Sequence, residues 1–218
     1  MAVNVLIGAE FALPASLERA WLDLLPPARR ARIAARPEPR GRARSLLGTR
    51  LLAEGLLRLG HPPAALQSMH EAPGGRLGLG VPVDISVSHA DGLVACALST
   101  AGAVGIDVEA LGAANAEHFR IYLSEAERAW AGVSPERFLA IWTRKEAVVK
   151  AAGTAGLAAV PAVDTMVGPE HASLNGTLWW TPALAVGPGY AAHLALADGP
   201  KPISLTRIER AALERALT

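Results

Sequence analysis

Two acidic residues, Asp107 and Glu109, lie two positions apart in the segment GIDVE. Alternate residues of a strand share a face, so both carboxylates would lie on one side while Ile106 and Val108 face a core. Neighbouring carboxylates repel each other unless a cation offsets their charge, and oxygen ligands favour a hard ion such as Mg²⁺. The pair therefore indicates a metal site or an exposed acidic strand end, and the pattern alone does not decide between them.

A second group of chemically active residues lies in the segment WTRKEAVVK. Trp142, Glu146 and Lys150 are spaced four apart, so a helix would place them along one face. An exposed Glu–Lys pair beside a core tryptophan is the alternative without a function. Lys145 adds a second amine next to the carboxylate, and one acid with two bases suits both phosphate and metal. The segment therefore favours phosphate chemistry.

Ser88 and His89 end the segment ISVSH directly before the turn ADG, where side chains can leave a sheet and meet a ligand. A lone histidine at a strand end is more often satisfied by backbone or water. Eight arginines lie between residues 29 and 50 against a single acid, Glu38, so the local field is strongly positive. This cluster indicates a phosphate ligand, a nucleic acid or a solvated basic face, although it lacks the aromatic residues typical of nucleic-acid grooves.

Secondary-structure patterns show which elements must position these residues. Capping signals at Ser124 and Pro135, and the glycine at Gly153, mark the ends of two of the helices. Hydrophobic periodicity predicts helices over 16–25, 43–60, 123–130 and 135–153 and strands over 3–7, 85–89, 93–99, 103–110, 177–183 and 190–197. Each half of the chain thus offers a long helix and several strands. We expect an α+β fold of two similar lobes that divide near residue 105.

Composition narrows the class of protein further. The 218 residues carry a formal net charge of +1 and a single cysteine, Cys96, which excludes an internal disulfide and multi-thiolate zinc sites. A reducing, cytoplasmic location is the expectation. The N-terminus has no basic region typical of a signal peptide, and no uncharged apolar stretch reaches the roughly 18 residues of a membrane-spanning helix. We therefore expect no membrane association.

Taken in order and spacing, Ser88–His89, GIDVE at 105–109 and WTRKEAVVK at 142–150 resemble the signature of Sfp-type 4'-phosphopantetheinyl transferases. The family pattern WxxKEAxxK is matched without a gap. Further similarity appears in RSLLG at 44–48, in GGR at 74–76 and in PGYAAHLAL near the C-terminus. The resemblance implies two αβ lobes related by a pseudo-twofold axis, with the active site in the cleft between them. Residues 1–105 would form the N-terminal lobe, with the coenzyme A contacts, and 106–218 the C-terminal lobe, with the metal site.

The resemblance also implies an activity: transfer of 4'-phosphopantetheine from coenzyme A to a serine of an acyl or peptidyl carrier protein in secondary metabolism, with release of 3',5'-ADP. It implies that Mg²⁺, with Mn²⁺ as an alternative ion, is held by Asp107, Glu109 and Glu146. The implied catalytic residues are Glu146, Lys150 and Asp107. The expected coenzyme A contacts are Arg29, Arg32, Arg44, Arg76, Ser88, His89, Lys145 and Lys150. Several family members have lysine at the positions of Arg29, Arg32 and Arg76, and Leu77 replaces the proline that usually follows the GGR-like turn.

The same resemblance points to carrier docking near residues 111–128. Leu111, Phe119, Tyr122 and Leu123 would supply an apolar contact there or belong to the core, and the sequence leaves both interpretations open. Two lobes in one chain would complete the cleft within a monomer. The rival classes are a coenzyme A or nucleotide-binding module without catalysis and, less favoured, a nucleic-acid-binding protein that uses the Arg29–Arg50 cluster.

Overall fold

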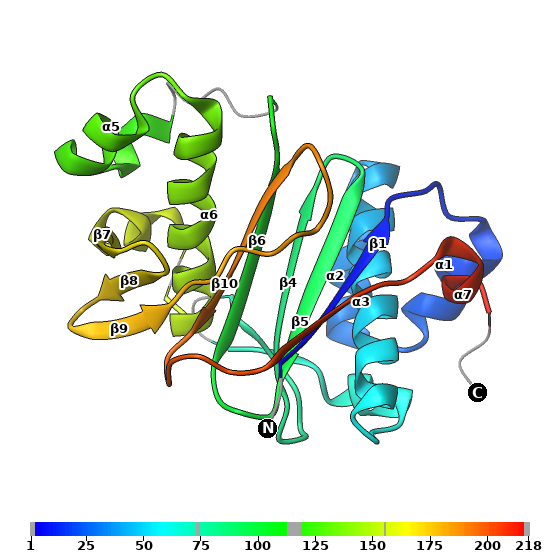
Figure 1. The fold of residues 1–218 in the computed structure, drawn as a ribbon. Helices are drawn as coiled ribbons and strands as arrows, with labels where there is room; N and C mark the ends of the chain where they lie inside the picture. The colour runs from blue at the N-terminus through cyan, green and yellow to red at the C-terminus, as the bar shows by residue number, and fades with distance from the viewer. Residues whose placement is uncertain (1–2, 73–74, 113–118, 155, 216–218) are drawn as a thin grey trace.

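The computed structural model describes residues 3–72, 75–112, 119–154 and 156–215, and it shows a mixed α+β fold (Figure 1). The expected α+β class is confirmed. The strands are β1 (Val3–Ala9), β2 (His70–Glu71), β3 (Leu77–Gly78), β4 (Asp84–Ala90), β5 (Leu93–Ser99), β6 (Val104–Ala110), β7 (Asp164–Gly168), β8 (His171–Leu174), β9 (Thr177–Trp180), β10 (Tyr190–Leu196) and β11 (Ile203–Arg207). The α-helices are α1 (Ala15–Leu22), α2 (Pro27–Ala34), α3 (Pro39–Arg58), α5 (Glu125–Ala131), α6 (Pro135–Ala152) and α7 (Arg210–Leu213). Short 3₁₀ helices lie at Pro63–Ser68, Arg120–Tyr122 and Leu157–Ala162.

The strands form two main sheets. The first has the order β11-β1-β5-β4 and the second the order β6-β10-β9-β8-β7, while β2 and β3 pair separately. The predicted hairpin is present, because β4 pairs antiparallel with β5. Strand β11 returns to pair parallel with β1, and Leu213 of α7 packs into the core of the first sheet. The end of the chain therefore joins the first sheet, although the expected division at residue 105 placed it in the second lobe.

The first sheet and strands β6 and β10 of the second sheet lie between the two long helices, with α6 beside β6 and β10 and with α3 beside β1 and β5, while β7, β8 and β9 lie on the other side of α6 (Figure 1). Alternation along the strands explains this layering. On β1, Val5 and Ile7 belong to a core between the two sheets, whereas Leu6 packs with the residues of α3. Strands β1 and β5 of the first sheet and β6 and β10 of the second thus bury both faces, one against a long helix and one against the other sheet.

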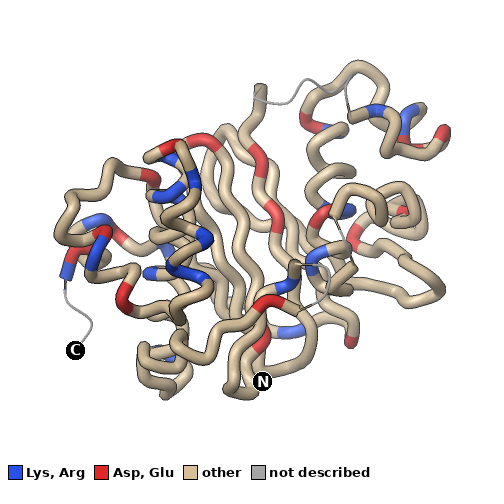
Figure 2. Tube along the Cα trace, turned by 180° about the vertical axis from the view of Figure 1, so that it is seen from behind, with Lys and Arg blue, Asp and Glu red and all other residues tan. Residues whose placement is uncertain are grey.

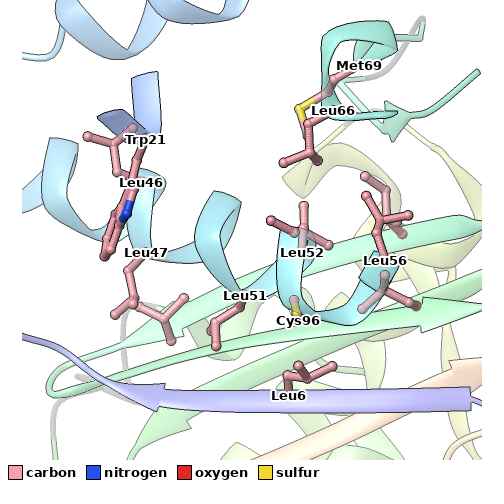
Figure 3. Packing of buried hydrophobic residues seen from close by; sticks show 14 of the residues in the cluster. Leu6, Trp21, Leu46, Leu47, Leu51, Leu52, Leu56, Leu66, Met69 and Cys96 are labelled. Carbon is pink, nitrogen blue, oxygen red and sulfur yellow. The ribbon is translucent and has the colours of Figure 1, made fainter. Parts of the chain in front are cut away.

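Helix α3 covers the first sheet with leucines at helical spacing, as the sequence pattern predicted. Figure 3 shows Leu47 and Leu51 on the side of α3 that faces Leu6 of β1, in the same core as Cys96 of β5. Full burial of one such side chain stabilises the fold by about 1.5–3 kcal/mol. Burial also raises the pKa of the Cys96 thiol to about 12, so this cysteine behaves as a small core residue rather than as a nucleophile.

The helix ends follow their sequence signals. Ser124 and Glu127 form the predicted capping box at the start of α5. Ser134 caps α6, Pro135 occupies its first turn, and Gly153 ends it in the left-handed conformation with φ 66°. These signals fix where α6 begins and ends, and therefore which residues it presents to β6. Among the described helices, none is long and apolar enough to cross a membrane.

Candidate active site

A pocket of about 340 Å³ lies between α2, the β2–β3 hairpin, β4 and the C-terminal half of α6. This volume suits a small-molecule ligand. Lysines and arginines gather along the helices at the side of the molecule, and few lie on the sheets (Figure 2). The described lining includes five cationic side chains, Arg29, Arg32, Arg36, Arg76 and Lys150, against two carboxylates, Glu71 and Glu146. This excess of positive charge favours a ligand with several negative charges.

Helix α6 reaches the acidic strand β6 because of a glycine. A Cβ atom at Gly105 would lie 1.9 Å from the carbonyl oxygen of Ala147 and 2.7 Å from the amide nitrogen of Ala151. Only glycine permits this approach of helix backbone to strand backbone. Since Glu146 and Lys150 stand on the same helix, the glycine of the GIDVE segment determines how close they come to the acids of β6.

Lys150 and Asp107 form the closest charged contact of the site. The Nζ atom of Lys150 lies 2.6 Å from Oδ1 of Asp107, and it also donates to Oγ of Ser88 at 3.0 Å and to the carbonyl oxygen of Ile106 at 3.2 Å. Ser88 in turn donates to Oδ1 of Asp107 at 2.8 Å. Asp107 is only 4% exposed, so its charge depends on these partners. Three predicted site residues from β4, β6 and α6 are thus brought together.

The acids of this cluster carry more negative charge than their neighbours offset. Burial, followed by the charge of Asp107, raises the pKa of Glu109 from its ordinary value of 4.5 to about 7, although Lys150 and a hydrogen bond from Trp142 act in the opposite direction. Burial and the charge of Asp107 also raise the pKa of Glu146. Among the described residues, Oδ2 of Asp107 and Oε1 of Glu146 are buried without any hydrogen-bond partner. One ammonium group therefore does not satisfy three carboxylates.

A divalent cation fits this shortage of positive charge, and Asp107 and Glu146 supply the two unpartnered oxygens. The described part of the chain holds no group of three His, Cys, Asp or Glu side chains already arranged to bind a metal, so the predicted three-acid set is not preformed. Mg²⁺ is commonly held by one or two carboxylates together with substrate phosphates. The residues present therefore fit Mg²⁺ that binds together with a phosphate ligand, with Glu109 beside the two principal acids.

The predicted phosphate-binding arginines line the opposite side of the pocket. Arg32 forms an ion pair with Glu71, and Nη1 of Arg29 lies 4.0 Å from the same carboxylate. Arg76 forms an ion pair with Asp84 at the start of β4. The structure thus brings Arg29, Arg32 and Arg76 to one pocket, each beside an internal carboxylate. A phosphate that enters the pocket would compete with these carboxylates.

Lys145 does not reach this pocket. Its Nζ atom lies 2.8 Å from Oε2 of Glu127 and donates to the carbonyl oxygen of Val163 at 2.5 Å, and both charged side chains are 0% exposed. Burial alone would raise the pKa of Glu127, but hydrogen bonds from Lys145, Ser124 and Thr165 lower it. The pair joins α5 to α6 in the interior. The expected contact between Lys145 and coenzyme A is therefore not supported by its position, and we assign this lysine a structural role.

Arg44 and His89 lie beyond the pocket lining, at the end of β4. Arg44 contacts Asp91 at 2.6 Å and Glu10 at 3.1 Å. His89 is exposed, yet partial desolvation and the neighbouring charges of Arg44 and Lys150 lower the pKa of its imidazole. The structure places His89 near both Arg44 and Lys150, but neither His89 nor Arg44 is among the groups that line the pocket.

The aromatic residues of the expected docking region pack against the active-site helix. Phe119 and Tyr122 are partly buried, and their rings lie 4.7 Å and 5.8 Å from the ring of Trp142. Leu123 is 4% exposed and belongs to the core, whereas Leu111 is 39% exposed. Residues 113–118 of the expected docking range, and Gly74 of the GGR turn, lie outside the described residues.

Sequence reasoning assigned no role to three residues that shape the pocket. Arg36 lines it, but it was one arginine among eight with no distinguishing pattern. Glu71 contacts an arginine 39 residues away, which no local pattern reveals. Gly105 was part of a recognised motif, and a glycine inside a strand pattern is a signal for close backbone approach that would have identified it.

A basic pocket beside a cluster of buried acids is typical of proteins that bind phosphate groups together with a metal ion. Residues 103–184 match the model of the 4'-phosphopantetheinyl transferase superfamily. This segment includes Asp107, Glu109, Glu146 and Lys150, and the match confirms the resemblance at the level of the superfamily and supports a transferase. The matched segment is less than half of the chain. The comparison with curated proteins found no match.

Proposed function

We propose that this protein is a transferase of the Sfp type that moves 4'-phosphopantetheine from coenzyme A to a serine of an acyl or peptidyl carrier protein. The site would lie in a cleft between two αβ lobes. One observation carries the proposal. Asp107 and Glu146 each have a buried oxygen without a hydrogen-bond partner, and these oxygens lie beside a pocket with five cationic side chains. Both acids belong to the segment that matches the superfamily.

The arginines of the pocket would bind the phosphate groups of coenzyme A. Arg29 and Arg32 project from α2, and Arg76 directly precedes β3, so together they suit the 3'-phosphate and adenine end. Lys150 lines the same pocket from α6 and would contact the pyrophosphate. The ligand would thus reach from α2 and the β2–β3 hairpin to α6.

Asp107 and Glu146, with Glu109, would hold Mg²⁺. When bound, this ion offsets the charge of the pyrophosphate and so eases attack on phosphorus.

The chain's own residues would carry the transfer. The serine hydroxyl of the carrier attacks the phosphorus attached to pantetheine, a new oxygen–phosphorus bond forms, and the pyrophosphate bond to 3',5'-ADP breaks. Glu146 stands on a rigid helix, and burial raises the pKa of its carboxyl, so it suits acceptance of the serine proton, directly or through water. Lys150 stabilises negative charge on the departing phosphate.

The rival function as a nucleic-acid-binding protein is less well supported. Several arginines of the Arg29–Arg50 cluster contact acids elsewhere in the chain, which reduces the positive field that a nucleic acid would meet. The pairs are Arg30 with Asp23, Arg32 with Glu71, Arg40 and Arg44 with Glu10 and Asp91, Arg42 with Glu18, and Arg50 with Glu54. Binding to DNA or RNA that falls steeply with salt would favour this rival.

Mass spectrometry of apo carrier proteins, incubated with this protein, coenzyme A and Mg²⁺, tests the proposed activity. We expect one phosphopantetheine to be added to a serine. Asp107→Asn and Glu146→Gln should each abolish transfer, because each loses a charged ligand of the proposed metal. Asp164→Asn is a matched control, since this exposed acid lies in the same matched segment, outside the pocket lining, and accepts a hydrogen bond from the backbone of Met166. Coenzyme A binding without transfer to any carrier would favour the non-catalytic rival.

Carrier docking near residues 111–128 remains part of the proposal. Ile121 is 77% exposed and lies between Phe119 and Tyr122, which pack on Trp142 beside the acids. Ile121→Ser should therefore raise the KM for the carrier severalfold and leave the KM for coenzyme A unchanged. An equal effect on both constants would argue against docking at this surface.

A further inference from the structure

Strands β4 and β6 meet at the junction of the two sheets. Strand β4 is the last strand of the first sheet, and β6 is the first strand of the second. The two strands lie against each other, but the described strand pairings join neither to the other. Backbone donors on the outer edge of β6 therefore need partners of another kind.

Three side chains of β4 supply those partners. Oδ2 of Asp84 accepts from the amide of Val104 at 2.7 Å, and Oγ of Ser86 accepts from the amide of Ile106 at 3.1 Å. Oγ of Ser88 accepts from the amide of Val108 at 3.4 Å. We call these three contacts the junction ladder.

The junction ladder has the period of a strand on both sides. Residues 84, 86 and 88 share one face of β4, and the amides of residues 104, 106 and 108 share one edge of β6. A face of β4 therefore stands against an edge of β6. The spacing between the two sheets is fixed by the length of short polar side chains, which are stiffer than a packing contact between long apolar groups.

Both ends of the junction ladder continue into the pocket. Asp84 at one end is the ion-pair partner of Arg76, which lines the pocket. Ser88 at the other end accepts from Lys150 and donates to Asp107, so every hydrogen-bonding capacity of its hydroxyl is used. Its contact with Asp107 leaves Oδ2 of that acid free and buried.

We propose that the junction ladder sets the distance between the basic and the acidic parts of the pocket, and that Ser86 is a positioning residue for phosphoryl transfer. This inference rests on the proposed function. Ser86 also lines the pocket, but it is the rung without a charged partner, so its substitution changes the junction and removes no charge from the site. Loss of its hydroxyl leaves the amide of Ile106 without this acceptor and removes the middle contact of the ladder, so the two sheets are held less firmly at their junction.

The test compares Ser86→Ala with two other variants. Ser86→Thr keeps the hydroxyl. Ser99→Ala is the matched control, because Ser99 is a buried serine of the same sheet whose hydroxyl accepts one backbone amide, that of Ala101 at 3.0 Å, rather than an amide of β6. We expect Ser86→Ala to lower kcat by about 10-fold to 100-fold and to raise the Kd for coenzyme A measured by calorimetry. Ser86→Thr should restore both values. Ser99→Ala should lower the thermal midpoint about as much as Ser86→Ala does, but it should leave kcat unchanged.

Amide hydrogen exchange in the unmodified protein gives a test that needs no variant. Amides 104, 106 and 108 should exchange slowly although they lie on a sheet edge. Fast exchange of all three would overturn the junction ladder, and equal kcat for Ser86→Ala and Ser99→Ala would overturn the role of Ser86. Absence of transfer by the unmodified protein would instead refute the proposed function, and the exchange measurement would still decide whether the ladder exists.

Discussion

Replacement of Gly105 by alanine tests whether the approach of α6 to β6 controls the site. The added Cβ would lie 1.9 Å from the carbonyl oxygen of Ala147, and the obstructing atoms belong to backbone rather than to a flexible side chain. Restoring an ordinary contact of 3.4 Å requires the helix and the strand to separate by roughly 1.5 Å. Overpacking of this kind destabilises a protein by about 1–3 kcal/mol.

The same displacement should damage catalysis more than stability. The 2.6 Å contact between Lys150 and Asp107 would stretch toward the limit of an ion pair, and Glu146 would move with the helix. A misplacement of about 1 Å in an active site costs on the order of 100-fold in rate. We therefore expect Gly105→Ala to retain a cooperative thermal transition at a lower midpoint and to lose about 100-fold in transfer of phosphopantetheine.

Gly8→Ala is the matched control for this experiment. Gly8 lies in β1, beside α3, and a Cβ there would meet the ends of the Leu213, Leu51 and Leu47 side chains at ordinary contact distances of 3.4 Å, 3.5 Å and 3.8 Å. This variant should keep both its midpoint and its activity. Circular dichroism and mass spectrometry of the carrier provide the two measurements. Unchanged turnover in Gly105→Ala would refute the argument that this contact sets the geometry of the acids.

Three further predictions concern single charged groups. Glu71→Gln should lower the KM for coenzyme A by about 2-fold to 5-fold without a change in kcat, because Glu71 competes with phosphate for Arg32 in a partly exposed pair; an unchanged KM would contradict this competition. Lys145→Met should lower the free energy of unfolding by about 3–5 kcal/mol, since it leaves Glu127 buried and uncompensated, and urea denaturation measures this loss. The folded fraction should keep its KM for coenzyme A, and a raised KM would restore a role for this lysine in binding. The pKa of Glu109 is raised in the fold to about 7, so burial of its charged form destabilises the protein. This destabilisation is absent below pH 4.5 and grows as the pH rises to about 7. Mg²⁺ should relieve that cost and raise the thermal midpoint more at pH 8 than at pH 5; equal shifts at both values would count against metal binding by these acids.

The sequence by itself determined the local geometry of the site. Alternation in GIDVE placed Ile106 and Val108 in a core, which puts both acids on the opposite face. Spacing of four in the long helix likewise brought Glu146 and Lys150 to one pocket. These features depend only on the periods of two residues in a strand and about 3.6 in a helix, and such periods can be recognised from residues close together in the sequence.

Only the tertiary structure decided which charged groups meet. Lys145 and Glu146 are adjacent in sequence, but successive helical residues point about 100° apart. Glu146 therefore faces the pocket, while Lys145 pairs with Glu127 in the interior. The pairing of Glu71 with Arg32 and the contacts of Ser86 across the junction also join elements far apart in the chain. Such contacts depend on how sheets and helices pack, and no period within a single element encodes them.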